Sequence, residues 1–507
     1  MKLFSVMILA LLFSCSSQEE SKNTLKIAID SVPRTADSRF AIDASSQYFE
    51  NLIHCSLIGF DQTGKVENQL AKDLKWEDAT TLLITLKNNI LFSDNSSVTS
   101  NDVKATFDFL MQKEGESISP RGSSFENVES ITIIDPYSLK IKLKNIDASF
   151  VTNLAIGILP VKLASEKKTL SETQIIGCGP FKIKSWTSQS IFLERNDSHL
   201  FPIAKGVVSE IEFKVVSDET TRMLKIQKGE VDLIQNILNR DQLKDILKTD
   251  KLELLKSPGL NVTYLGFNMQ DKILKDLKVR QAISHAIKRE EITEHILNGY
   301  ASLAQAFLPP NDQYFFKSVN YIYDIELAKK LLDEAGYKDP DGDGPLSRFS
   351  LSYKTTTNTT RQVIANSFSH QLKKIGIDVK VVSMEWGKFK KDVEEGNVQL
   401  WSLNWVGFKD PDIFRYAFAT SSFIPVGGNR GKYSNLTLDA LLEKGRQQID
   451  PTQRKIIYNE VQKILGEDLP YLMLWHEDNF VVKKRNIQNY EIYADGRMQS
   501  LVNVKIK

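Results

Sequence analysis

The stretch over residues 264–289, YLGFNMQDKILKDLKVRQAISHAIKR, combines two different hydrophobic periods. Residues 264–268 alternate with a period of two, which is typical of a half-buried strand. From Asp276 to Ile287 the apolar residues recur at i, i+3 and i+4, which predicts an amphipathic helix with Asp276 as its N-cap or first-turn acid. A strand followed by such a helix suits a crossing between two domains. An ordinary core strand and helix fits the pattern about equally well.

The chain begins with the features of an export signal. Lys2 precedes an apolar run over 3–13, which has the length of a signal peptide and is too short for a stable membrane-spanning helix. The sequence Leu12-Phe13-Ser14-Cys15 resembles a lipobox, in which the cysteine is acylated and becomes the mature N-terminus. We expect a signal peptide over 1–14 and a lipidated tether over 15–23; the alternative is ordinary secretion with an incidental Cys15.

Composition narrows the class of protein. The 65 lysines and arginines balance 64 aspartates and glutamates, so a nucleic-acid partner is disfavoured. Without residues 1–14 the chain would keep 507 − 14 = 493 residues, enough for two or three domains with real cores. Beyond Cys15 the cysteines are Cys55 and Cys178, which in an exported protein form either one disulfide or two buried thiols.

Signatures of catalysis are missing from the sequence. It has no G-x-S-x-G elbow, no H-E-x-x-H pair, no Walker loop and no G-x-G-x-x-G. We therefore expect no enzymatic activity and no cofactor. The acidic turn over 339–344, DPDGDG, opens like an EF-hand loop, but its twelfth position is Ser350 where a bidentate glutamate is needed. We expect no metal site.

Aromatic residues gather in the region 400–433, around Asp410-Pro411-Asp412. Trp401, Trp405 and Phe408 belong to this group, and Asn429, Arg430 and Tyr433 follow it. Small-molecule clefts combine flat apolar walls with a few fixed polar groups in this way. A core cluster is the alternative interpretation of the aromatic residues.

An ordered set of motifs resembles the family 5 solute-binding proteins of ABC importers, the oligopeptide-, dipeptide- and nickel-binding receptors. The motifs are Gly177-Cys178-Gly179-Pro180-Phe181, Phe267-Asn268, Asp276 with Val279-Arg280 and Ala282, Gly299-Tyr300-Ala301, Leu308-Pro309-Pro310, Trp405 with Asp410-Pro411, and Asn429 with Tyr433. The resemblance implies an α/β, two-lobed periplasmic-binding-protein fold (class II, Venus flytrap) with an extra small α/β subdomain. We expect lobe I over 24–47, 176–262 and 480–507, the subdomain over 48–175 and lobe II over 263–479.

The resemblance also implies a ligand site. In the family's peptide receptors the backbone beside the tryptophan binds an extended peptide, and an aspartate three residues after it pairs with the peptide's amino terminus. Phe408 occupies that position here, so Asp410 is our candidate substitute, and Arg430 is our candidate for a peptide carboxylate. The expected ligand contacts are Trp405, Val406, Phe408, Asp410, Asn429, Arg430, Tyr433, Asn268 and Arg34.

These expectations give a function and two alternatives. The first is a monomeric, lipid-anchored receptor of the cell envelope, on the periplasmic or extracytoplasmic side, which binds a small peptide or peptide-like ligand and delivers it to ABC permease subunits. The second is a ligand-sensing or signalling lipoprotein of the same fold. The third, an unrecognised hydrolase, is disfavoured by the missing motifs. If Trp405 lines the cleft, its replacement by alanine should leave the unliganded protein nearly as stable.

Overall fold

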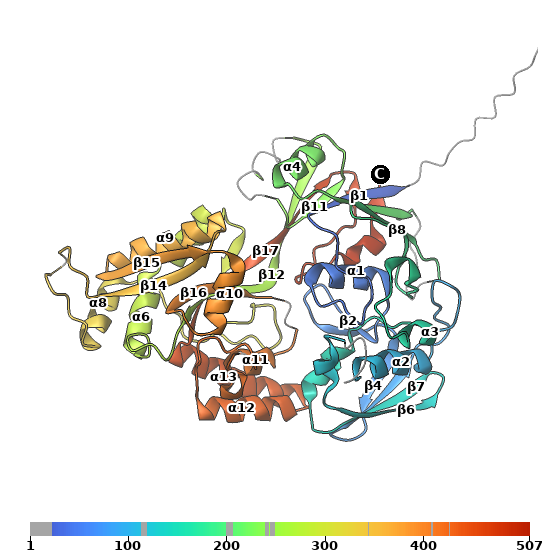
Figure 1. The fold of residues 1–507 in the computed structure, drawn as a ribbon, viewed down its shortest axis with the longest axis horizontal. Coiled ribbons are helices and arrows are strands. Elements are labelled where there is room, and N and C mark those ends of the chain that lie inside the picture. Colours follow the sequence, from blue (N-terminus) through green and yellow to red (C-terminus); the bar gives the residue numbers. More distant parts are fainter. Residues whose placement is uncertain are drawn as a thin grey trace, which may run out of the picture.

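The computed structural model describes residues 23–112, 119–198, 206–238, 243, 249–342, 344–406, 409–424 and 426–507. Two lobes lie side by side, joined by the long strands β12 (Leu252–Phe267) and β17 (Tyr471–Lys484) (Figure 1). One sheet continues through both lobes in the order β15-β14-β16-β12-β17-β11-β1-β10-β9-β8, with β13 beside β17. The other strands of this sheet are β1 (Thr24–Ile29), β8 (Phe181–Trp186), β9 (Ser190–Arg195), β10 (Glu210–Val215), β11 (Leu233–Gln235), β13 (Ala301–Leu303), β14 (Phe349–Thr356), β15 (Ile377–Met384) and β16 (Leu400–Trp405).

The two long strands change register where they pass between the lobes. Residues 252–258 of β12 pair with 484–478 of β17, the pairing shifts between Pro258 and Val262, and it resumes toward Gly266 and Tyr471. Gly259 lies in this irregular segment, and a Cβ there would come within 2.3 Å of the Glu477 carbonyl oxygen. The close approach of the two backbones therefore requires glycine at this position.

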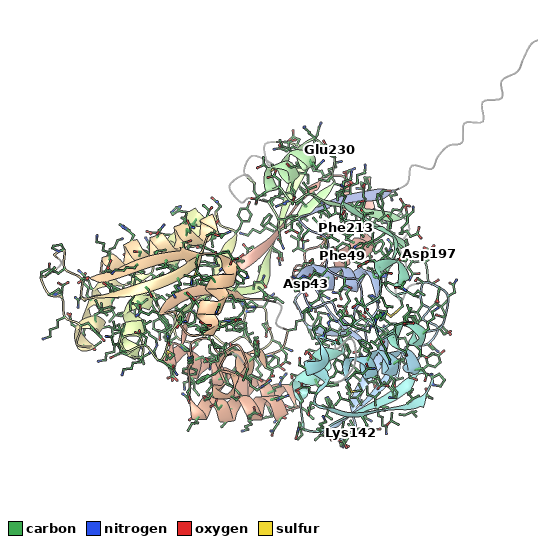
Figure 2. All side chains as sticks on the ribbon, in the orientation of Figure 1. Asp43, Phe49, Lys142, Asp197, Phe213 and Glu230 are labelled. Atoms are coloured by element: carbon green, nitrogen blue, oxygen red, sulfur yellow. A yellow bond between two sulfur atoms is a disulfide. The ribbon has the colours of Figure 1, made fainter. Side chains whose placement is uncertain are left out.

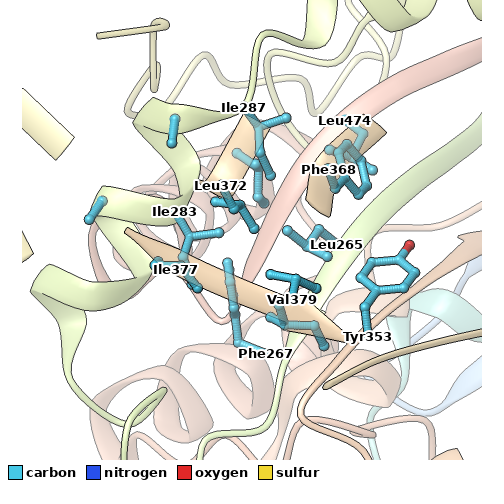
Figure 3. Packing of buried hydrophobic residues seen from close by; sticks show 14 of the residues in the cluster. Leu265, Phe267, Ile283, Ile287, Tyr353, Phe368, Leu372, Ile377, Val379 and Leu474 are labelled. Carbon is cyan, nitrogen blue, oxygen red and sulfur yellow. The ribbon is translucent and has the colours of Figure 1, made fainter. Parts of the chain in front are cut away.

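Lobe II is built around residues 264–289, which form the end of β12 and the helix that follows it. Leu265 and Phe267 of β12 pack with residues of β15, α6 (Leu277–Ala286) and α9 (Thr359–Lys373) in one apolar cluster (Figure 3). Tyr264 points to the other face of the sheet, where it is also fully buried. The prediction of a half-buried strand was therefore wrong, because β12 lies in the interior of a sheet that is covered on both faces. Helices α8 (Ile325–Glu334), α10 (Trp386–Glu394), α11 (Ile413–Phe418), α12 (Leu436–Gln447) and α13 (Pro451–Asp468) complete this lobe.

Lobe I packs helix α1 (Ala44–Ile53) on its part of the sheet. The rings of Phe49 on α1 and Phe213 on β10 lie 4.6 Å apart between centroids, and both residues are labelled in Figure 2. Helix α4 (Glu219–Gln227) belongs to a second apolar cluster, with β11 and the lobe I half of β17. Leu501 and Val504, in the C-terminal segment beyond β17, belong to the same apolar cluster as Phe49 and Phe213.

The small subdomain has a four-stranded sheet in the order β4-β5-β7-β6 and the helix α2 (Ser100–Leu110). Its strands are β4 (Ala71–Trp76), β5 (Thr81–Leu86), β6 (Val128–Asp135) and β7 (Ser138–Leu143), and the pair β2 (Ile58–Phe60) and β3 (Val66–Asn68) lies beside them. Cys55 and Cys178 form a disulfide with their Cα atoms 5.1 Å apart, which decides the alternative that the sequence left open. The predicted domain boundaries stay a prediction, although α1, placed mostly in the subdomain, packs on lobe I.

Several helix starts follow the local sequence signals. Asp276 accepts a hydrogen bond from the Lys278 backbone N–H and caps α6, as predicted. Asp450 caps α13, with Pro451 at its first position. A capping box joins Thr99 to Asp102 at the start of α2. Within the described ranges, no helix is both long and apolar enough to cross a bilayer.

Candidate functional site

A cavity of about 610 Å³ lies between the lobes beside the β12–β17 pair. Lobe II supplies the end of β14, the start of α9, and parts of β16 and β17, and lobe I supplies α4 and the segment after β11. Its polar and aromatic lining includes Glu219, Asn236, Thr263, Tyr353, Thr355, Asn358, Arg361, Ser402, Asn404, Trp475, Glu477 and Phe480. The parallel strands β14 and β16 end here, and open α/β sheets commonly bind ligands at such strand ends.

Strand β16 has an open edge on the side of this cavity. On one side β12 pairs with β16 along its whole length, from Phe267 opposite Leu400 to Val262 opposite Trp405. On the other side β14 pairs with Leu400 and Trp401 only. Within the described part of the chain, no strand pairs with residues 402–405 on that side. An extended segment from another molecule could add there through main-chain hydrogen bonds.

Two oppositely charged side chains stand in the cavity wall. Arg361 lies in the first turn of α9 and donates from its guanidinium to the Ser402 carbonyl oxygen at 3.4 Å. Glu477 on β17 accepts from the Asn404 amide at 3.0 Å and from the Thr263 hydroxyl at 3.4 Å. The wall therefore offers a cation and an anion to a zwitterionic ligand.

A second cavity, of about 520 Å³, also lies between the lobes, and we call it the Lys409 chamber. From lobe II it is lined by Lys409, Asp410, Asp412, Ile413 and Tyr416; across from them lie Ile42, Gln47, Phe60, Arg121, Ser149, Thr152, Asn153 and Ile156. Burial raises the pKa of Asp412 to about 6, against the Arg415 guanidinium, which lowers it. Both cavities are thus built from the two lobes together.

Trp405, expected in the cleft wall, is only 6 % exposed. Its ring centroid lies 6.2 Å from that of Tyr264, 6.2 Å from that of Phe307 and 6.0 Å from that of Tyr416. The Arg430 guanidinium lies 4.6 Å from the ring centroid. Trp405 therefore packs in the core of lobe II at the end of β16, and a direct ligand contact by its ring stays a prediction.

The residues after Trp405 differ in exposure. Val406 is 62 % exposed, which leaves it accessible to a ligand. Phe408 lies outside the described residues. Asp410 pairs with Arg454 through both carboxylate oxygens, each at 2.7 Å. Its proposed role as the acceptor for a peptide amine stays a prediction, in which a ligand amine would have to compete with Arg454.

Asn429 and Tyr433 are held inside lobe II. The Asn429 amide donates to the carbonyl oxygens of Phe418, Ala419 and Tyr433, and its oxygen accepts from the Tyr433 backbone N–H. The Tyr433 hydroxyl donates to the Asp468 carboxylate at 2.5 Å. Both residues are almost fully buried, so these bonds account for their polar groups within the chain.

The remaining predicted contacts lie in three different settings. The Arg430 guanidinium is 3.4 Å from the Tyr264 hydroxyl oxygen, and among the described residues it has no carboxylate partner. Asn268 donates to the carbonyl oxygens of Gly396 and Val398, so it fixes the turn at the end of β12. Arg34 is exposed on the loop after β1.

Three residues of this cavity, Arg361, Asn404 and Glu477, were not among the ligand contacts predicted from the sequence. Neither Arg361 nor Glu477 belongs to any of the family motifs. A signal did exist, because polar residues directly after a predicted parallel strand lie at the carboxyl edge of the sheet. Among the described residues no cluster of three or more metal-ligating side chains occurs.

Two lobes joined by two strands, with polar cavities between them, define a two-lobed solute-binding protein of the periplasmic-binding-protein type. The profile of the bacterial extracellular solute-binding proteins, family 5, matches residues 65–424. The chain belongs to this family, as its motifs indicated. Its relatives are binding receptors rather than enzymes.

Individual relatives extend the match over most of the chain. The oligopeptide-binding protein AppA of Bacillus subtilis is 29 % identical, over 97 % of this chain and 96 % of its own. The glutathione-binding protein GsiB of Salmonella paratyphi A is 27 % identical, over 92 % of each chain. The structure of Bacillus subtilis AppA in complex with a nonapeptide is similar with a TM-score of 0.75 and 27 % identity, over 96 % of this chain and 99 % of that one.

Proposed function

We propose that this protein is the solute receptor of an ABC importer and that it binds an oligopeptide-like ligand between its lobes. The observation that carries the proposal is the open edge of β16 at residues 402–405, which adjoins the 610 Å³ cavity. A peptide laid along this edge would gain main-chain hydrogen bonds that do not depend on its side chains. This mode suits a receptor that accepts many sequences.

The charged groups of the cavity favour a ligand with two charged ends. Arg361 is placed to bind a ligand carboxylate, and Glu477 is placed to bind a ligand amine. The start of α9 fixes the position of Arg361, and strand β17 fixes the position of Glu477. Arg430 stays a second candidate for the carboxylate, since it has no ion pair among the described residues.

Closure of the lobes would enclose the ligand, and the irregular segment between Pro258 and Val262 is the natural place for the chain to bend. The closed receptor would then be recognised by the permease subunits in the membrane. We further propose that the signal peptide ends at residue 14 and that lipid on Cys15 anchors the protein to a membrane of the cell envelope, on the periplasmic or extracytoplasmic side. Cys15 lies outside the described residues, so the lipobox sequence alone supports this step.

Native mass spectrometry of the purified protein tests the proposal, first for a co-purifying peptide and then with a synthetic pool of four- to nine-residue peptides. A retained peptide is next resynthesised with single N-methylated amides. Addition to the β16 edge predicts that N-methylation weakens binding strongly at alternate positions and little between them, because only alternate amides face a neighbouring strand. Equal tolerance at every position would contradict strand addition. Absence of any retained peptide would contradict a peptide-like ligand.

A further inference from the structure

Lys409 crosses from lobe II to the opposite wall of the Lys409 chamber. Its ammonium nitrogen lies 3.4 Å from the Asp495 carboxylate and 3.9 Å from the centroid of the Phe60 ring. Asp495 belongs to the C-terminal segment that packs on lobe I, and Phe60 to the β2–β3 pair. The Lys409 side chain is 23 % exposed, so it still reaches the space of the chamber.

The Asp495 carboxylate beside Lys409 also pairs with Arg497. Arg497 contacts Asp495 through its Nε at 2.6 Å, closer than Lys409 does. One carboxylate between two cations leaves this group of three side chains with a net positive charge. Burial lowers the pKa of Lys409 to about 8, against Asp495, which raises it, and this agrees with an ammonium that lacks full compensation.

The other charged residues around the chamber form pairs. Arg121 pairs with Glu50 at 2.8 Å, Asp410 with Arg454 at 2.7 Å and Asp412 with Arg415 at 3.1 Å. Together with Asp495 and Arg497 these are four matched pairs. Among the charged residues that line this chamber, Lys409 is therefore the odd cation, while Asp312, which lines a neighbouring cavity with Lys409, has no ion pair among the described residues.

We propose that the Lys409 chamber is a further subsite for the ligand, in which Lys409 selects ligands that carry an anionic group besides the carboxylate that Arg361 would receive. The inference rests on the proposed function and deepens it by naming the charge of the ligand. A carboxylate placed in the chamber accepts a charge-assisted hydrogen bond from the Lys409 ammonium. The same ligand carboxylate also balances the positive charge of Lys409, which the surrounding ion pairs leave uncompensated.

A simpler role would be a contact that only holds the lobes together. Such a contact stabilises the closed lobes for every ligand equally, whatever its charge. An anion-recognition residue instead discriminates between ligands that differ only in charge. The two roles therefore predict different results for the same pair of peptides.

The test uses the full exported chain and two synthetic pools of four- to nine-residue peptides, identical except that each glutamate in one pool is glutamine in the other. Each pool is made as free acids and as C-terminal amides. Native mass spectrometry identifies retained peptides, and calorimetry gives the affinity of each retained peptide and its neutral twin. We expect the anionic member to bind about ten- to a hundredfold more tightly, the range of one charge-assisted hydrogen bond.

Three variants assign that preference. Lys409→Met should abolish it, and Lys409→Arg should keep most of it. Lys380→Met, at an exposed lysine of β15 that lines neither cavity, should leave it unchanged. Equal affinity for both members of each pair in the unmodified protein, or a preference that survives Lys409→Met, would overturn the inference while the proposed function stands. Equal weakening of both members by Lys409→Met would show a lobe contact only. Absence of any retained peptide would instead remove the proposed function.

Discussion

Replacement of Trp405 by alanine should destabilise the unliganded protein, because the indole is packed rather than exposed. Its side chain is 6 % exposed and lies against the rings of Tyr264, Phe307 and Tyr416. Truncation of a buried tryptophan to alanine costs about 3–5 kcal/mol, from lost burial and from the cavity that remains. At about 2–4 °C per kcal/mol for a unit of 150–250 residues, the transition that unfolds lobe II should fall by about 6–20 °C.

Differential scanning calorimetry of the ligand-free protein measures this change, with Val406→Ala as the matched control. Val406 is the next residue and is 62 % exposed, so its truncation should shift the transition by less than about 2 °C. A ligand-free Trp405→Ala protein that melts with the unmodified one would refute the packing argument. That result would instead support the expectation from the sequence, in which the tryptophan is a free wall of the cleft.

Three further predictions concern the disulfide, the hinge and pH. The Cys55→Ala, Cys178→Ala double variant should lose about 5 kcal/mol of unfolding free energy in urea, because the crosslink closes a loop with a sequence separation of 123 residues; a loss below about 1 kcal/mol would contradict this. Gly259→Ala should weaken peptide binding, measured by calorimetry, because its Cβ would meet the Glu477 carbonyl oxygen at 2.3 Å; unchanged affinity would show that the hinge can adjust. Burial lowers the pKa of His476 to about 4, against backbone carbonyl oxygens of Ala306 and Asn261, which raise it. Between about pH 4 and 6.5 the unfolded chain therefore binds more protons than the folded chain. Acidification across that window should lower the unfolding free energy, measured in urea, by up to about 3 kcal/mol. The His476→Gln variant should lack this contribution to the loss.

Features that depend on residues close together in the chain, such as helix caps, are predicted best from the sequence. The caps at Asp276 and Asp450 depend on side-chain oxygens that bind backbone groups two or three residues away, and the structure has both. The full burial of Tyr264 could not be read from alternation, since that pattern shows two faces but not what covers each of them.

The site was harder to predict because it forms between segments that are distant in the chain. Arg361 and Glu477 are 116 positions apart and become neighbours in one cavity only when β14, β16 and β17 share a sheet. Trp405 carries the family motif, yet its motif cannot say whether the ring or the adjacent backbone faces the ligand. That question depends on the packing of Phe307, about a hundred residues earlier.

Because β12 and β17 are hydrogen-bonded to each other on both sides of the irregular segment between the lobes, the lobes do not swing on two independent tethers. A paired ribbon flexes easily out of its plane and resists shear within it, so opening should follow one preferred direction. A donor and an acceptor dye placed on α4 and α9 would then report every stage of the cycle along a single distance.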